Sequence, residues 1–178
     1  MITYPLGVSG QAIVLTPAVL RRFEVHRQLC WWSREAGGQL FARLLPSTVV
    51  IEEATGPRPT DRRSPFSYRP DRRGEQAEID DAHRRGLHFV GDWHTHPQPR
   101  PTPSGRDVRN IADIVLRSSH PFAGLVLVIV GQDPAPHGLL VAVSEGERLL
   151  VLGPAGAQRR TIARLDVSGP EAVGNQPD

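Results

Sequence analysis

One segment near the middle of the chain restricts the fold more than any other, because an apolar run there is followed by four prolines at alternate positions. The run that begins at Phe89 and ends in His94 and His96 is typical of a strand. Prolines at positions 97, 99, 101 and 103 exclude a continued central strand and require an extended loop. From Ser104 onward, apolar residues recur at helical spacing. The sequence therefore predicts a strand, an extended loop and a helix in succession.

The two histidines at the end of this strand are placed to bind one metal ion. His94 and His96 are two positions apart, so on a strand their side chains point to the same face. A catalytic zinc typically takes three protein ligands, and imidazole nitrogen is a favoured one. Asp107 lies in the first turn of the following helix, close to where the loop folds back. We therefore expect His94, His96 and Asp107 to hold one Zn²⁺ per chain.

Each part of this pattern also has a simpler interpretation. Ser104 and Asp107 fit an N-cap with an acidic residue at the positive end of the helix dipole. A single histidine is more often a surface or core residue than a ligand. The combination of two histidines at strand spacing, a following proline and a Ser-x-x-Asp element is poorly explained by capping, and it favours a metal site.

These residues resemble the motif of the JAMM zinc metalloproteases, a family also called JAB or MPN+. The likeness lies in His94-x-His96-Pro97 and Ser104-x-x-Asp107, with seven residues between His96 and Ser104. It extends over about residues 11–151. The resemblance implies a three-layer α/β domain, with a mixed β-sheet flanked by helices, and a zinc-dependent peptidase activity.

The family motif also contains an upstream glutamate that is not a metal ligand, in the element E-x-x-G. Glu35-Ala36-Gly37-Gly38 matches it, although Ala42 stands where many members have glycine. The resemblance implies that Glu35 is the general base, which takes a proton from the water at the metal and delivers it to the departing amine. Glu52 and Glu53 are competitors for this role, at the end of an apolar run where acidic residues usually mark a solvated strand end.

Two further polar residues near the motif have candidate roles. Ser104 is placed to donate a hydrogen bond to the carbonyl oxygen on which negative charge develops, so we expect it to be catalytic as well as a helix cap. Asp92 is on the same side of the strand as His94, where it could orient a ligand histidine. We expect Asp92 to be an exposed strand residue instead.

A narrower resemblance concerns the segment from Gly91 to Pro97 and the arginine-rich stretch before it. Both are similar to small bacterial JAMM proteins of antiphage operons and integrative elements. Those operons pair a deconjugating peptidase with ubiquitin-activating and ubiquitin-conjugating homologues. The resemblance therefore implies that the substrate is a ubiquitin-like protein or its conjugate, and that such homologues are potential partners.

The arginine-rich stretch, residues 56–73, contains six arginines and two aspartates and so carries a charge of +4. Clustered arginines favour phosphate, but four prolines and few aromatics indicate a loop, which disfavours nucleic acid. A plain solvated loop is one interpretation. The other is a substrate flap, since in related JAMM peptidases an insertion here clamps the extended tail of the ubiquitin-like protein by adding a strand. Phe66 and Tyr68 are the substrate-binding candidates.

Length and composition limit the remaining possibilities. A chain of 178 residues is long enough for one domain with a sizeable core, which we place at residues 1–153, followed by a partly ordered tail at 154–178. Cys30 is the single cysteine, so an intramolecular disulfide and a cysteine-based zinc cage are excluded. The apolar runs are too short for a bilayer and residues 1–15 do not read as a signal peptide, so we expect a cytoplasmic protein without membrane contact.

The periodicity of apolar residues predicts an α/β order. Helices are expected from Thr16 to near Trp31 and from Glu75 to Arg85, and the stretch between Gly56 and Arg73 is expected to be irregular. Besides the histidine-bearing strand, the expected strands are Gln39–Leu45 and Val49–Glu53 as a hairpin, Ala123–Val130 as a central strand, Leu139–Val143 and Arg148–Leu152.

Two other classes of function remain open. A non-catalytic MPN-type binding module is disfavoured because such a scaffold has no need for all five motif residues. Another metal-dependent hydrolase that begins with His-x-His usually needs a longer chain and further histidine ligands, and His120 and His137 lie in expected loops. A zinc deaminase is disfavoured because its Pro-Cys-x-x-Cys element is absent.

Overall fold

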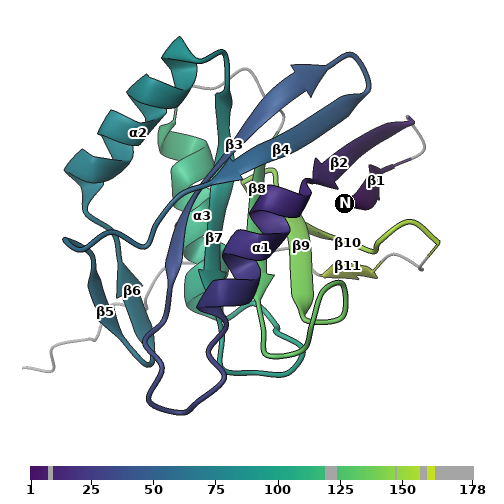
Figure 1. Cartoon of the computed structure of the whole chain (residues 1–178). Coiled ribbons are helices and arrows are strands. Elements are labelled where there is room, and N and C mark those ends of the chain that lie inside the picture. Colours follow the sequence, from purple (N-terminus) through teal and green to yellow (C-terminus); the bar gives the residue numbers. More distant parts are fainter. Residues whose placement is uncertain (8–9, 119–123, 147, 157–159, 163–178) are drawn as a thin grey trace, which may run out of the picture.

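A curved mixed sheet of nine strands forms the centre of the described chain (Figure 1). The computed structural model describes residues 1–7, 10–118, 124–146, 148–156 and 160–162. Strands β2 and β4 are parallel, as are β7 and β8, and the other neighbours are antiparallel. The spatial order is β1 (Ile2–Leu6), β2 (Gln11–Leu15), β4 (Thr48–Ala54), β3 (Gly37–Leu45), β7 (His88–Thr95), β8 (Leu125–Val130), β9 (Leu139–Ser144), β10 (Leu149–Leu152) and β11 (Arg160–Ile162).

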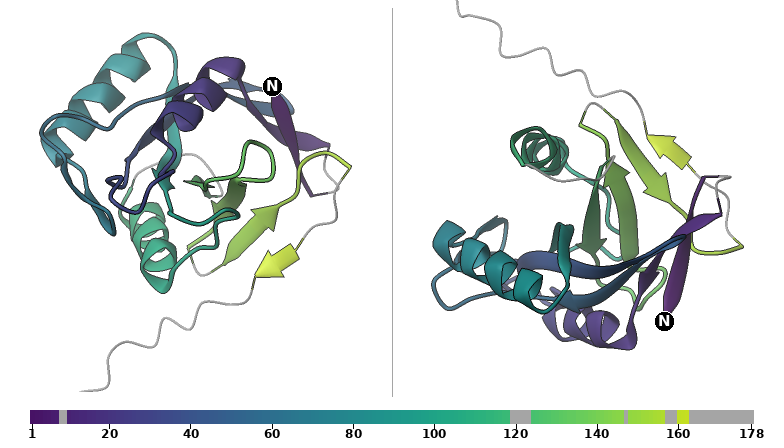
Figure 2. Two further views of the ribbon diagram at one scale, coloured as in Figure 1. Left: turned by 60° about the horizontal axis from the view of Figure 1, so that its bottom comes forward. Right: turned by 90° about the horizontal axis from the view of Figure 1, so that it is seen from above.

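Helices cover both faces of this sheet. Strand β8 is buried along its whole length, and its even-numbered residues pack in one core with helix α1 (Pro17–His26). Its odd-numbered residues pack on the opposite face with helix α3 (Gly105–Arg117). Helix α2 (Arg72–Arg84) covers the α3 side of β3, and Phe89 packs against the cores beneath both helices. The predicted three-layer α/β arrangement with a mixed sheet is confirmed (Figure 2).

The curvature of the sheet brings its two ends together. Strand β1 lies against β10, and the backbone N–H of Ala155 donates to the carbonyl of Thr3 at 2.9 Å (Figure 2). The sheet therefore wraps around the core beneath α1, which contains Tyr4, Ile13 and Phe23. Strands β1 and β2 were not predicted, because they are short and β1 contains Pro5.

Most predicted elements are present with shifted ends. The hairpin is confirmed as β3 and β4, and the predicted strands near the C-terminus are confirmed as β8, β9 and β10. The first helix was predicted too long: it ends at His26, and Gln28 turns inward to hydrogen-bond buried groups. The second helix begins earlier than predicted because the Asp71 side chain caps it, accepting from the N–H of Arg73.

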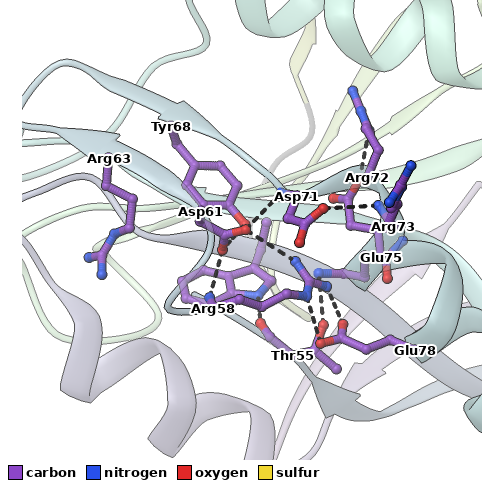
Figure 3. A network of polar contacts seen from close by, with 12 residues as sticks. Thr55, Arg58, Asp61, Arg63, Tyr68, Asp71, Arg72, Arg73, Glu75 and Glu78 are labelled. Atoms are coloured by element: carbon purple, nitrogen blue, oxygen red, sulfur yellow. Dashed lines mark hydrogen bonds and ion pairs between the residues drawn. The ribbon is translucent and has the colours of Figure 1, made fainter.

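The prediction that residues 56–73 are irregular is partly wrong. This stretch contains a two-stranded hairpin of β5 (Arg62–Ser64) and β6 (Ser67–Arg69). Asp61 anchors this hairpin by accepting hydrogen bonds from the Tyr68 hydroxyl at 3.1 Å and from the main-chain N–H of Arg58 at 2.6 Å (Figure 3). The Arg58 guanidinium in turn pairs with Glu78 of α2. A largely buried polar network therefore fixes the hairpin to α2.

None of the helices in the described part of the chain has the length and apolar character needed to cross a bilayer. The predicted tail from residue 154 contains strand β11, which pairs with β10. The rest of that tail beyond residue 162 lies outside the described residues, as does His120.

Candidate metal centre

The site begins at the C-terminal end of β7, a strand that lies between β3 and β8. His94 is on β7, and the N–H of His96 donates to the carbonyl of Val130 at 2.9 Å, which fixes the chain just beyond the strand. The side chains of both histidines point toward α3, whose first turn carries Asp107. The strand, loop and helix predicted from the sequence therefore bring these three residues together.

The candidate ligand atoms of the three residues lie within 4.8 Å of one another. His94 Nε2 and His96 Nε2 are 3.2 Å apart, and each lies 3.3 Å from a different carboxylate oxygen of Asp107. Tetrahedral zinc with ligands at about 2.0–2.1 Å requires its ligand atoms to be about 3.3–3.4 Å from one another. The donor set and these nitrogen–nitrogen and nitrogen–oxygen spacings are therefore compatible with ligation of one zinc ion, and the side chains are only 11–16% exposed.

Asp107 has a second contact that fixes its carboxylate. The backbone N–H of Ser104 donates to Asp107 Oδ2 at 2.7 Å, and the N–H of Asp107 donates to Ser104 Oγ at 3.2 Å, which completes a capping box. Burial acts to raise the pKa of Asp107, but hydrogen bonds from His94 and His96 outweigh it and hold that pKa well below its ordinary value. Asp107 is therefore ionised, as a metal ligand must be.

Glu35 lies just before β3 and lines the same groove as the three candidate ligands. Burial raises the pKa of its carboxyl group, and the nearby His94 and His96 lower it in part. A half-buried carboxylate with a raised pKa, next to a metal centre, has the properties of a general base. Ser104 also lines this groove, and its side chain is exposed to it.

The main chain beside Glu35 is fixed from the histidine strand. The N–H of Ala36 donates to Thr95 Oγ1 at 2.9 Å, and the N–H of Thr95 donates back to the carbonyl of Ala36 at 2.8 Å. The Thr95 hydroxyl donates to Gln28 Oε1 at 2.9 Å. Gly38, the glycine of the E-x-x-G element, is required here, because a Cβ at that position would come within 2.0 Å of the Thr55 carbonyl.

The two substrate-binding candidates occupy different environments. Phe66 is at the tip of the β5–β6 hairpin and is 78% exposed. Tyr68 faces the base of the groove, where its ring lies so close to Gly37 that a Cβ there would meet it at 2.7 Å. Burial and the neighbouring Asp61 raise the pKa of the Tyr68 hydroxyl. Both side chains line the groove, but only Phe66 presents most of its surface to a partner.

The other acidic residues considered from the sequence have different surroundings. Glu52 pairs with Arg43 at 3.0 Å and Glu53 with Arg85 at 2.6 Å, as expected for the solvated end of a strand. The expectation that Asp92 is exposed was wrong: its Oδ1 is buried and has no hydrogen-bond partner in the described structure. Burial raises the pKa of Asp92 to about 7. Asp92 lies opposite Gln39 in the β3–β7 ladder, and Gln39 Oε1 is also buried without a partner there.

The groove that contains these residues is large and open. Its volume of about 2080 Å³ exceeds the roughly 300–1,000 Å³ of most small-molecule pockets. Its walls are α2, the β5–β6 hairpin and α3, and its floor includes β7. A groove of this volume has room for a polypeptide segment.

Three residues that hold the site were not found from the sequence. Thr95, Gln28 and Arg63 each contact the segment around Glu35 or a residue bonded to it. Thr95 had one available signal, since it is a polar residue on the buried face of a strand between two candidate ligands. No signal in the sequence indicated Gln28 or Arg63, because their partners are distant in the sequence.

The fold and the site together define an α/β domain of the JAB kind with a candidate metal centre. A family model described as prokaryotic homologs of the JAB domain matches residues 17–144. The chain therefore belongs to this family.

Two bacterial isopeptidases are similar to this chain over part of its length. A CD-NTase/cGAS isopeptidase of Enterobacter hormaechei is 37% identical over 90 residues, which are 50% of this chain and 49% of the relative. Another of the same name from Vibrio cholerae is 34% identical over 104 residues, or 56% of this chain and 65% of the relative. The match thus spans less than two thirds of either relative.

A solved structure supports the fold. The solution structure of protein DSY2949 from Desulfitobacterium hafniense superposes with a TM-score of 0.52 at 20% identity, and the match covers 85% of this chain and 91% of that one. At this level of identity the likeness concerns the fold alone.

Proposed function

We propose that this chain is a zinc-dependent isopeptidase that cleaves an amide or isopeptide bond at the C-terminus of a ubiquitin-like protein or of a conjugated partner, in a bacterial antiphage conjugation system. The observation that carries the proposal is the cluster of His94, His96 and Asp107 in the same groove as Glu35. The names of the relatives favour a CD-NTase as the conjugated protein. An open groove on the scale of a peptide is consistent with such a substrate.

In the proposed mechanism, His94, His96 and Asp107 would hold the zinc, which when bound would activate a water and polarise the scissile carbonyl. Glu35 accepts the proton of that water on its carboxylate and later delivers it to the departing amine. The raised pKa of Glu35 suits both steps, since the group must gain and lose a proton near neutral pH. Ser104 donates its hydroxyl hydrogen to the carbonyl oxygen as negative charge develops there.

The groove would position the rest of the substrate. An extended C-terminal tail would lie between the β5–β6 hairpin and α3, with Phe66 in contact with it or with the body of the attached protein. The exposed Arg69 of the hairpin, which lines the groove, adds positive charge beside this path. Main-chain hydrogen bonds to a hairpin edge would contribute affinity without requiring a particular tail sequence.

The variant Glu35→Gln tests this proposal. Zinc content would be measured by mass spectrometry. Hydrolysis would be measured with a CD-NTase isopeptide conjugate as the substrate. We expect the parent chain to bind one zinc and cleave the conjugate, and Glu35→Gln to bind zinc but lose at least about 100-fold in kcat. Glu52→Gln is the matched control, because it removes the same charge on a strand away from the groove.

The possible results separate the functions that the sequence left open. Zinc binding by the parent chain with no hydrolysis would contradict the isopeptidase and favour a non-catalytic MPN-type binding module. Equal hydrolysis by the parent and Glu35→Gln would reject Glu35 as the base. A parent chain that binds no zinc when it is supplied in excess would refute the metal centre itself.

A further inference from the structure

Arg63 of the β5–β6 hairpin forms hydrogen bonds with the main chain at and before Glu35. Its Nε donates to the carbonyl of Glu35 at 2.6 Å, and its Nη2 donates to the carbonyl of Arg34 at 3.3 Å. The next hairpin residue contributes a third bond, in which the N–H of Glu35 donates to the carbonyl of Ser64 at 2.8 Å. Both polar main-chain groups of Glu35 are therefore bonded to two consecutive residues of one strand.

The hairpin is itself anchored from the opposite side. Arg63 pairs with Tyr68 in the β5–β6 ladder, and the Tyr68 hydroxyl donates to Asp61, whose side chain is fully buried. Arg58 joins this network to Glu78 of α2 (Figure 3). Because these contacts hold the hairpin to a helix, Arg63 is a fixed point for the Glu35 segment and does not simply follow its movement.

The other side of the Glu35 segment is fixed as well, since Ala36 is bonded twice to Thr95 between the two histidines. Glu35 is thus held between the metal-binding strand and the hairpin. We propose that Arg63 is a positioning residue for Glu35: it sets the distance of the carboxylate from the metal centre without touching substrate or metal. This inference rests on the proposed isopeptidase function.

The chemistry of the side chain explains why arginine stands here. A guanidinium group presents several N–H donors in a rigid planar fork, so it can bond two successive carbonyls at once and hold their spacing. A lysine ammonium is a point donor on a flexible stem and would hold that spacing less firmly. Arg63 points toward the Glu35 segment, whereas Phe66 at the tip of the same hairpin is exposed to a partner. One hairpin would therefore link substrate contact to placement of the base.

The test compares Arg63→Met with Arg62→Met. The first variant keeps most of the alkyl stem but removes the donors, and the second removes the same charge from the adjacent, exposed hairpin residue. Hydrolysis would be measured with a CD-NTase isopeptide conjugate and with a short fluorogenic peptide amide. We expect Arg63→Met to lower kcat about 10- to 100-fold on both substrates, with KM on the peptide and zinc content unchanged. Arg63→Lys should recover part of kcat, and Arg62→Met should match the parent.

Hydrogen exchange of the intact chain provides a readout that does not depend on hydrolysis. The Glu35 amide should exchange faster in Arg63→Met than in the parent or in Arg62→Met, while peptides of β7 stay equally protected. Unchanged kcat in Arg63→Met, or equal exchange in both variants, would overturn the inference. If the parent binds zinc but hydrolyses neither substrate, the proposed function is refuted, and the positioning role is refuted with it. The exchange result still decides whether Arg63 fixes the Glu35 segment.

Discussion

Thr95 and Ala36 are joined by two reciprocal hydrogen bonds, so the strand that presents the candidate metal ligands also fixes the residue next to Glu35. The Ala36 N–H donates to Thr95 Oγ1 at 2.9 Å, and the Thr95 N–H donates to the Ala36 carbonyl at 2.8 Å. His94 and His96 point to one face of the chain and Thr95 to the other. Three consecutive residues therefore place two of the candidate metal ligands and fix the main chain beside Glu35, the proposed base.

Replacing Thr95 with valine should destabilise the protein and disturb the site. Valine has a similar shape but lacks the hydroxyl, so the Ala36 N–H and Gln28 Oε1 would remain buried without a partner. We expect a loss of about 2–4 kcal/mol in the free energy of unfolding in urea. Thr95→Ser keeps the hydroxyl and should lose only about 1 kcal/mol. Equal losses in the two variants would mean that the hydroxyl bonds contribute little.

Asp107→Asn should abolish stabilisation by zinc while leaving the fold intact. Asparagine keeps an oxygen that can accept from the Ser104 N–H, so the capping contact can survive, but the ligand loses its charge. For the parent, zinc at about 100 times its Kd should add about 2.7 kcal/mol to the free energy of unfolding, and a chelator should remove that gain. The variant should unfold at the same temperature with or without zinc. A zinc-dependent shift as large as that of the parent would argue against Asp107 as a ligand.

The three candidate metal ligands could be predicted from the sequence because local rules place them. Strand periodicity puts His94 and His96 on one face, prolines end the strand, and the next helix begins at Ser104 with Asp107 in its first turn. Strand β8 could be predicted for a similar reason, since a continuous apolar run indicates burial on both faces.

The supporting contacts could not be predicted, because they join residues that are far apart in the chain. Thr95 bonds Ala36 across 59 positions and Gln28 across 67, and Arg63 reaches Glu35 across 28. The burial of Asp92 could not be predicted either. Strand alternation placed Asp92 on the correct face, but only the tertiary structure shows that α2 and the hairpin enclose that part of the face. The early end of the first helix at His26 likewise follows from the distant partners of Gln28.

Phe66→Ala and Tyr68→Phe should affect different properties. Phe66 is exposed at the hairpin tip, so its truncation should raise KM for a folded conjugate by roughly 5- to 30-fold, with little change in stability or in KM for a short peptide. Tyr68→Phe keeps the ring in the groove but loses the hydroxyl bond to Asp61, so we expect about 1 kcal/mol less stability and an unchanged KM. If Phe66→Ala raised KM equally for conjugate and peptide, Phe66 would contact the tail and not the attached protein.

Two substitutions at Ser104 separate its role as a helix cap from its proposed catalytic role. Ser104→Ala should cost about 1 kcal/mol in the free energy of unfolding, whereas Ser104→Gly should cost only a few tenths, because glycine is accepted at the N-cap. Both variants lose the hydroxyl donor, so kcat should fall by a similar factor, about 100-fold. Thermal melts and steady-state kinetics would be measured on the same preparations. A kcat that follows stability across the two variants would indicate that Ser104 acts through the helix alone.

The buried carboxyl group of Asp92 should make the protein less stable as the pH rises toward neutrality. Its pKa is about 7 in the folded chain, against about 3.9 for an unfolded aspartate, so the folded state keeps a proton that the unfolded state releases. The resulting stability is fully present below about pH 4 and is lost as the pH rises through 7. Asp92→Asn removes this titration and adds an N–H donor opposite Gln39, whose Oε1 has no partner in the described structure.

Urea unfolding between pH 4 and 8 would therefore show a falling free energy of unfolding for the parent and a flatter profile for Asp92→Asn, with the variant more stable at pH 8. Asp113→Asn is the matched control, because it removes the same charge from a side chain of α3 that is 64% exposed. Its profile should run parallel to that of the parent. Parallel profiles for the parent and Asp92→Asn would show instead that the Asp92 carboxyl group stays ionised in the folded protein, with water supplying the hydrogen bonds to its buried oxygen.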